Sequence, residues 1–127
     1  MAHDNKKFVI QEHSKGSDIH WDFMLESGDV LQTYRLNKAP QQIGDDPANA
    51  EKIFDHPLKF LSYEGPVNKG LGSVRIVESG SYEITHQSND RIELDLNGKF
   101  LKGKFTLTHN EDDNFIPRGW QFGKSNI

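Results

Sequence analysis

The sequence predicts a mainly β protein, a small antiparallel β-barrel with one short helix. Apolar and polar residues alternate with a period near two in many short segments. Turn-forming pairs such as Ser79-Gly80 and Asn97-Gly98 separate these segments. Eight Phe, three Tyr and two Trp indicate a folded core, since disordered chains are poor in aromatic residues. Many short strands at this spacing are typical of a closed or nearly closed barrel.

The expected strands, in chain order, are Lys7 to His13, Ile19 to Glu26, Val30 to Leu36, Leu58 to Tyr63, Ser73 to Glu78, Tyr82 to His86, Arg91 to Leu96, Lys99 to His109 and Trp120 to Lys124. Asn97-Gly98 predicts a hairpin turn, because both residues tolerate positive φ. The helix is expected to have Asp46 as its cap and Pro47 at its start, and to continue to Ile53. Residues 110–119 are expected to form an exposed loop.

Length and composition limit the class of protein. The 127 residues are expected to form one domain over residues 1–127. A formal charge of −4 argues against a general nucleic-acid coat protein, although it is compatible with a local basic groove. The lysines available for such a groove are Lys15, Lys38, Lys52 and Lys59. The absence of cysteine excludes disulfides, thiol catalysis and cysteine zinc sites.

The chain has no apolar run of the ~18 residues that a membrane helix needs, and its N-terminus does not lead into a signal-type apolar region. We therefore expect a cytoplasmic protein with no membrane partner. A barrel with charged edges has no evident dimer interface, so we expect a monomer.

The segment from Ile19 to Glu26 carries the clearest chemical signal. In a strand, successive side chains point to opposite faces, so one face is apolar and the other carries possible ligands. The expected inward residues are Ile19, Trp21, Phe23 and Leu25, and the expected outward residues are His20, Asp22, Met24 and Glu26. His20 and Asp22 would lie side by side, roughly 7 Å apart along the strand.

His13 is the candidate third ligand, because a hairpin through residues 14–18 would bring it beside His20. Two imidazoles and one carboxylate with open positions form a set used for Mn²⁺, Fe²⁺ and Zn²⁺. A metal held there would act as a Lewis acid and activate a bound water. The alternative is that the three polar side chains simply lie on a solvated strand face.

Several motifs together resemble a known family. They are Phe-Val-Ile-Gln-Glu-His at 8–13, Ile-His-Trp-Asp-Phe-Met-Leu-Glu at 19–26, Asp-His-Pro-Leu-Lys-Phe-Leu-Ser-Tyr-Glu-Gly at 55–65, Gly-Ser-Val-Arg-Ile-Val-Glu-Ser-Gly-Ser-Tyr-Glu at 72–83, Leu-Asn-Gly-Lys-Phe-Leu-Lys-Gly-Lys-Phe-Thr-Leu at 96–107 and Trp-Gln-Phe-Gly-Lys at 120–124. In this order, over nearly the whole chain, they resemble the 3′-phosphoesterase module of bacterial end-joining DNA ligase D. Within that family the chain resembles single-domain relatives that lack the ligase and polymerase parts.

The resemblance implies a β-barrel with a manganese-dependent site on its outer surface, which removes a terminal ribonucleoside and then the remaining phosphate from 3′ ends in DNA repair by non-homologous end joining. It implies that His13, His20 and Asp22 hold the metal. It also implies catalytic roles for His56 and Lys38, which would bind the phosphate, with His56 as imidazolium or as the acid for the leaving oxygen. The expected partners are a nucleic-acid 3′ end and a separate ligase or polymerase. For both side chains the plain alternative is an ordinary loop or surface residue.

Three positions depart from the family pattern. Met24 replaces an arginine that reaches the substrate phosphate, Phe60 replaces a tyrosine and Phe54 replaces a glutamate. These changes remove polar contacts and bear most on the phosphatase step. Met24 and Phe60 are expected to pack at the edge of the groove, or alternatively to line a pocket for a base. Arg35 and Arg75 are candidates to replace the missing guanidinium.

Two other functions therefore stay open. One is a metal-containing module that has lost catalysis and binds nucleic acid or protein. The other is a hydrolase of a smaller phosphoester.

Overall fold

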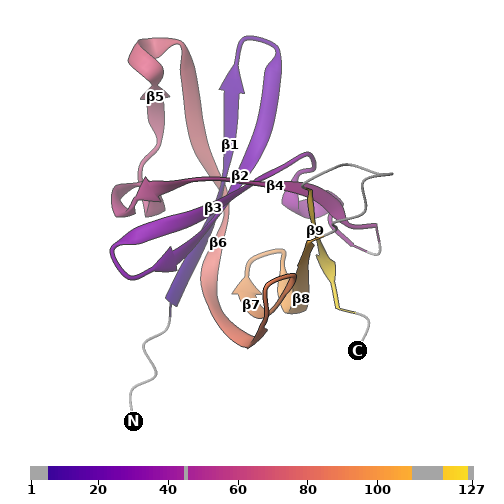
Figure 1. Ribbon diagram of the computed structural model, residues 1–127. Coiled ribbons are helices and arrows are strands. Elements are labelled where there is room, and N and C mark those ends of the chain that lie inside the picture. The colour runs from indigo at the N-terminus through magenta and orange to yellow at the C-terminus, as the bar shows by residue number, and fades with distance from the viewer. Residues whose placement is uncertain (1–5, 45, 110–118, 126–127) are drawn as a thin grey trace.

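In the computed structural model, residues 6–44, 46–109 and 119–125 are described, and their strands form one closed antiparallel sheet (Figure 1). The strands are β1 (Lys6–Lys15), β2 (Asp18–Ser27), β3 (Val30–Leu36), β4 (Ala48–Pro57), β5 (Gly65–Val67), β6 (Gly72–Gln87), β7 (Arg91–Gly98), β8 (Lys102–His109) and β9 (Trp120–Lys124). They lie in the order β1-β2-β3-β4-β9-β8-β7-β6-β5. A further pairing of β1 with β6 closes an eight-stranded ring and leaves β5 outside it. The predicted antiparallel β-barrel is confirmed.

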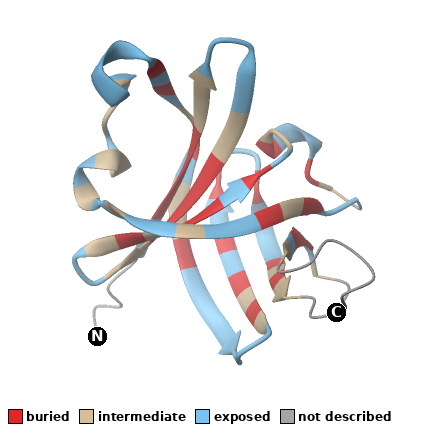
Figure 2. Cartoon of the chain, turned by 45° about the horizontal axis from the view of Figure 1, so that its top comes forward, coloured by how far each residue is buried: buried red, intermediate tan, exposed pale blue. Residues whose placement is uncertain are grey.

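Buried residues recur along the barrel strands (Figure 2). Aromatic side chains form the centre of this core. The Phe122 ring lies 4.6 Å from the Phe23 ring and 5.5 Å from the Phe105 ring, and none of the three side chains is more than 2% exposed. Strand β7 shows how the sequence produces this core, because Ile92, Leu94 and Leu96 are buried at alternate positions. Burying each large apolar side chain contributes roughly 1.5–3 kcal/mol to folding.

The predicted helix from Asp46 to Ile53 is wrong, because these residues lead into and form part of β4. Ala48 and Ala50 are buried at a period of two and pair with Phe122 and Trp120 of β9. Sheet pairing and burial therefore outweigh the helix propensity of this alanine-containing segment.

The helical elements among the described residues are three 3₁₀ turns: η1 (Pro40–Gln42), η2 (Leu58–Leu61) and η3 (Asn68–Gly70). The strand predicted from Leu58 to Tyr63 is thus also wrong, since it begins with η2. Over the described part of the chain, no helix has the length and apolarity required to traverse a bilayer.

Two predicted strands and the Ser79-Gly80 turn between them form one continuous strand, β6. Gly80 lies opposite Gly98 in the β6–β7 pairing. A Cβ added at Gly80 would lie 2.1 Å from the carbonyl oxygen of Asn97, so glycine allows the two backbones to approach closely. In this strand glycine marks a close contact and not a turn.

The hairpin between β7 and β8 turns two residues later than Asn97-Gly98 predicts. Gly98 is the last residue of β7, and its N–H donates to the Leu101 carbonyl, so the turn falls on Lys99 and Phe100. The buried Glu78 carboxylate accepts the backbone N–H groups of these two residues and of Leu101 at 2.7–2.8 Å. It also accepts the N–H of Ser79 at 2.8 Å. A side chain distant in sequence therefore fixes this turn.

A second, smaller apolar cluster lies on the outer face of the sheet. Val9, Met24 and Leu31 are fully buried there, and side chains of the η2 segment, including Phe60, pack over them. The Gln11 amide ties the η2 segment to β1 by donating to the carbonyls of Phe60 and Tyr63 at 2.9 and 2.8 Å.

Because of this cluster, the burial of side chains along β2 differs from the predicted alternation. Met24 points outward as expected but is fully buried, because η2 covers it, while Ile19, expected in the core, is 49% exposed. The expectation that Met24 and Phe60 pack as apolar side chains is confirmed.

Candidate metal centre

The hairpin of β1 and β2 brings the three predicted ligands together. His13 lies directly opposite His20, and Gln11 lies opposite Asp22. Because side chains two residues apart share a face, His13, His20 and Asp22 all project from the outer face. The two-residue turn Gly16-Ser17 fixes this register, with Lys15 paired to Asp18.

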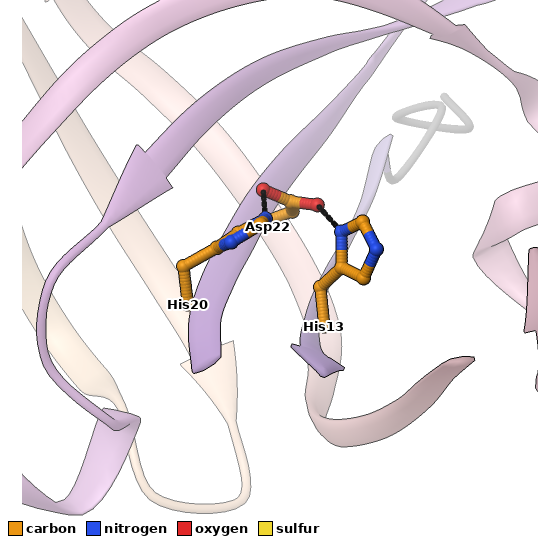
Figure 3. Close-up of side chains that lie close together, drawn as sticks. All are labelled: His13, His20 and Asp22. Atoms are coloured by element: carbon orange, nitrogen blue, oxygen red, sulfur yellow. Dashed lines mark ion pairs between the residues drawn. The ribbon is translucent and has the colours of Figure 1, made fainter. Parts of the chain in front are cut away.

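The three side chains point toward one another (Figure 3). His20 Nε2 lies 3.4 Å from Asp22 Oδ1, and His13 Nδ1 lies 3.8 Å from Asp22 Oδ2. The two imidazole centroids are 4.6 Å apart. One ligand atom from each residue can be chosen so that all three atoms lie within 4.8 Å of one another. This separation suits side chains arranged around a common cation.

Polar atoms of this cluster are buried without hydrogen-bond partners. Among the described residues, His13 Nε2, His20 Nε2 and Asp22 Oδ1 make no hydrogen bond although they are shielded from water. Leaving a buried polar atom unpaired costs about 1–3 kcal/mol, so native proteins rarely tolerate several together. A cation bound between His20 Nε2 and Asp22 Oδ1 would use the lone pairs of these two atoms, and His13 would offer Nδ1, which faces Asp22, while its Nε2 lies toward Gly72. The donor set therefore fits a divalent metal.

Burial also sets the charge of the cluster. It lowers the pKa of His20 to about 4, and the positive charges of Arg35 and His13 act in the same direction. Burial likewise lowers the pKa of His13, again assisted by Arg35. It raises the pKa of Asp22 to about 6, with Arg35 opposing the shift. Near pH 7 the cluster thus presents two neutral imidazoles and a mainly ionised carboxylate, the protonation states that metal ligands require.

Gly72 leaves space beside His13. A Cβ at position 72 would lie 3.1 Å from His13 Nε2 and 3.1 Å from the Ser14 carbonyl oxygen. A larger residue would press on the imidazole from β6.

His56 lies on the same outer face, paired with Leu31 of β3. Its Nδ1 is 2.9 Å from Thr33 Oγ1 and 3.1 Å from the Phe54 carbonyl oxygen. The Thr33 hydroxyl donates to the Leu31 carbonyl, and the Phe54 carbonyl can only accept, so both contacts require a proton on Nδ1. The neutral His56 ring therefore carries its lone pair on Nε2.

Burial lowers the pKa of His56, and the charges of Arg35 and His13 lower it further, against an opposing hydrogen bond to the Phe54 carbonyl. The neutral ring is thus favoured in the free protein. A phosphate placed beside Nε2 would favour the protonated ring instead, because it adds negative charge.

Arg35 and Arg75 lie on different faces of the sheet. Arg35 pairs across strands with Asp22, and its Nε lies 3.9 Å from Asp22 Oδ1, with 43% of its side chain exposed. Arg75 pairs with Glu12 across β1 and β6, with its Nε 3.1 Å from Glu12 Oε1. Glu12 points away from the face that carries Gln11 and His13. Arg35 alone of this pair lies beside the candidate centre.

Lys38 is not joined to the cluster. It follows the end of β3 and is half-buried, and no hydrogen bond or ion pair within the described residues connects it to His13, His20 or Asp22.

Sequence reasoning missed Thr33, Gly72 and Gln11. Thr33 orients the His56 ring, and Gly72 leaves space for the His13 ring. Gln11, opposite Asp22, holds the η2 segment against β1. Only Gln11 had a sequence signal, because it stands two residues before His13 and so shares its face. The other two depend on neighbours that are distant along the chain.

By its fold and site, this protein is a closed antiparallel β-barrel that carries a histidine and carboxylate cluster on its outer face. The family profile of the DNA Ligase D 3′-phosphoesterase domain matches residues 11–109. The chain belongs to this family.

Relatives include the multifunctional non-homologous end joining protein LigD of Mycolicibacterium smegmatis, 29% identical over 89% of this chain. The multifunctional non-homologous end joining DNA repair protein LigD of Mycobacterium tuberculosis strain H37Rv is also 29% identical over 89% of the chain. The Pseudomonas aeruginosa protein of the first name is 28% identical over 80%. The chain spans 16% of the length of the first two relatives and 13% of the third.

Proposed function

We propose that this protein is a metal-dependent phosphoesterase that processes the 3′ ends of nucleic acid in DNA repair, removing a terminal ribonucleoside, a phosphate or both. One observation carries the proposal: two imidazoles and a carboxylate converge on the outer face of a barrel of the 3′-phosphoesterase family, and His20 Nε2 and Asp22 Oδ1, which face each other, are buried without hydrogen-bond partners. His13, His20 and Asp22 would hold the cation, for which manganese is our first candidate. A divalent cation supplies Lewis acidity, which polarises a phosphoryl oxygen and acidifies water.

His56 would contact the phosphate through Nε2, because its Nδ1 proton is engaged by Thr33 and the Phe54 carbonyl. In the neutral state Nε2 can take a proton, and in the protonated state it can donate one to a phosphoryl or leaving oxygen. The hydrogen bonds on Nδ1 keep the ring in one orientation in both states.

Arg35 would supply the guanidinium that the family has at the position of Met24. Met24 is fully buried beneath η2, whereas Arg35 extends from the neighbouring strand and is part-exposed beside Asp22. Glu51 lies opposite Arg35 on β4, and among the described residues no ion pair joins the two side chains. A guanidinium is well suited to hold phosphate by two parallel hydrogen bonds.

The experiment is a turnover assay with and without Mn²⁺. Primer-templates ending in a 3′-ribonucleotide or a 3′-phosphate are compared with a generic phosphodiester. We expect Mn²⁺-dependent shortening or dephosphorylation of the 3′ ends, and its loss in His20→Ala and Asp22→Ala. Unchanged activity in both variants would exclude the proposed site, and turnover restricted to the generic compound would indicate a smaller phosphoester as substrate.

Arg35 has a matched control in Arg75. Removing a guanidinium that contacts a transferring phosphoryl group is expected to lower kcat/KM by roughly 10- to 100-fold. We expect this loss in Arg35→Ala and little change in Arg75→Ala, since Arg75 pairs with Glu12 on the other face. Equal effects of the two substitutions would remove Arg35 from the phosphate site.

Buried Met24 favours a second candidate, a binding module without turnover. It leaves an apolar cluster where the family pattern has a polar phosphate contact. Mn²⁺-dependent binding of the same 3′ ends, with no product after prolonged incubation, would support this candidate.

A further inference from the structure

A chain of aromatic contacts leads from the second apolar cluster to the surface and ends at Phe54. The Phe60 ring packs edge-on against Tyr63 at 5.5 Å and against His56 at 5.8 Å. The Phe54 ring stacks on His56, with centroids 4.8 Å apart and planes only 11° from parallel. Phe54 is thus the outer ring of a stack whose inner members are fixed by packing.

Phe54 is also 74% exposed, more than any other large apolar side chain among the described residues. Single exposed apolar residues are common and carry no argument by themselves. This ring differs because it lies parallel to the imidazole that we assign to the phosphate, and its exposure leaves it open to a further planar group. Positive charge beside these rings comes from Lys59, whose Nζ lies over the Phe60 ring at 5.4 Å from its centroid. Lys52 does not add to it, because its Nζ is paired with Asp55 Oδ1 at 3.9 Å.

We propose that Phe54 is a stacking platform for the unpaired base of the 3′-terminal nucleotide. The inference rests on the proposed action at nucleic-acid 3′ ends. In a nucleotide the base is joined to its phosphate through one sugar, so a phosphate beside His56 brings the attached base near the Phe54 ring. Aromatic side chains combined with nearby cations are the usual means of holding single-stranded bases without reading their identity. The replacement of the family's glutamate by Phe54 would therefore add a contact specific to this chain.

The test compares two single-stranded oligonucleotides that differ only in the 3′-terminal residue, which carries a base in one and is abasic in the other. Binding is measured by fluorescence anisotropy with and without Mn²⁺. We expect the protein to bind the base-bearing end more tightly by a factor of about 5 to 150, the range found for stacking one base. Phe54→Ala should reduce this ratio to near one, whereas Phe54→Trp should keep it.

Phe100→Ala is the matched control, because Phe100 is 45% exposed on the β7–β8 turn. It should keep the full preference for the base-bearing end. If loss of the Phe54 ring disturbed His56, the protein would bind both oligonucleotides more weakly by the same factor. The ratio of the two affinities therefore separates stacking from that indirect effect.

Equal binding of the two oligonucleotides, no binding of either, or a preference that survives in Phe54→Ala would each overturn the inference. A base preference without any Mn²⁺-dependent turnover would support the platform while the proposed enzyme activity fails. Turnover without a base preference would support the proposed enzyme activity and overturn the stacking platform.

Discussion

Glu78 and Asp22 are both carboxylates that the fold removes from water, at 2% and 4% exposure, and they differ in what surrounds them. Glu78 accepts four backbone N–H groups at 2.7–2.8 Å, which satisfies both of its oxygens. Asp22 has two histidines and one arginine at 3.4–3.9 Å, and its Oδ1 has no hydrogen bond. The comparison separates a carboxylate that completes the fold from one whose unsatisfied oxygen suits a ligand.

The largest expected effect is the loss of stability on replacing Glu78. In Glu78→Gln, one oxygen becomes an NH₂ group that faces backbone donors, so buried N–H groups lose their acceptor. We expect the free energy of unfolding to fall by about 3 kcal/mol or more. Urea denaturation measures this change, with the exposed Glu83→Gln on the same strand as a control expected to stay within about 0.5 kcal/mol. An unchanged urea midpoint for Glu78→Gln would contradict the structural role assigned to the Glu78 carboxylate.

Binding of Mn²⁺ should stabilise the protein through Asp22. At a free metal concentration about 100 times Kd, the free energy of unfolding is expected to rise by about 2.7 kcal/mol. Thermal unfolding with and without Mn²⁺ measures the effect. Asp22→Asn should abolish the shift, while His86→Gln, a change at an exposed histidine on β6, should retain it. An equal shift in both variants would show that Mn²⁺ binds elsewhere.

Without metal, Asp22→Asn should behave opposite to Glu78→Gln. Burial raises the pKa of Asp22 to about 6, so the carboxylate is mainly ionised at pH 7 but its ionisation is less favourable in the fold than in the unfolded chain. Removing the charge is expected to leave stability unchanged or to increase it by up to about 2 kcal/mol in a chelator. The assay is urea unfolding at pH 7 with excess chelator. A loss of stability as large as that of Glu78→Gln would mean that Asp22 is a structural carboxylate as well.

The smallest effect concerns pH in the metal-free protein. His20 has a pKa near 4 in the fold and 6.5 in the unfolded chain, so between these values the unfolded state binds more protons and stability rises with pH. Asp22 has a pKa near 6 in the fold and 3.8 unfolded, so the folded state binds more protons in that interval and stability falls as pH rises. The two contributions oppose each other from about pH 4 to pH 6.

Replacing His20 or Asp22 should expose the pH dependence of stability that the remaining group contributes. Relative to the natural protein, His20→Gln should lose stability as the pH rises from 4 to 6, and Asp22→Asn should gain it. Urea midpoints across this range, with metal chelated, measure both slopes. Slopes of the same sign in the two variants would contradict the assigned shifts.

The β1–β2 hairpin could be predicted from sequence, because its strands and their alternation are local. His20 and Asp22 are separated by one residue, and the turn that sets the register with His13 lies between the two strands. The convergence of these side chains therefore needed no information from the rest of the chain. Their surroundings could not be predicted in this way, because η2 covers the outer face from a position more than thirty residues beyond β2.

The wrong predictions also have tertiary causes. Ala48 and Ala50 have good helix propensity, but their pairing partners are in β9. Asn97-Gly98 suits a turn by local preference, yet the carboxylate of Glu78 fixes the turn at Lys99 and Phe100. In each case a contact with a neighbouring strand outweighs a local preference of less than about 1 kcal/mol per residue.

The hairpin origin of the three candidate ligands has a practical consequence. Every backbone pairing of the barrel, including the closure between β1 and β6, forms between strands without any ligand as an intermediary. We therefore expect that a cation bound at the proposed site can be removed and another introduced without a refolding step. Cobalt, whose absorption bands report coordination number, could then serve as a spectroscopic reporter in an otherwise undisturbed barrel.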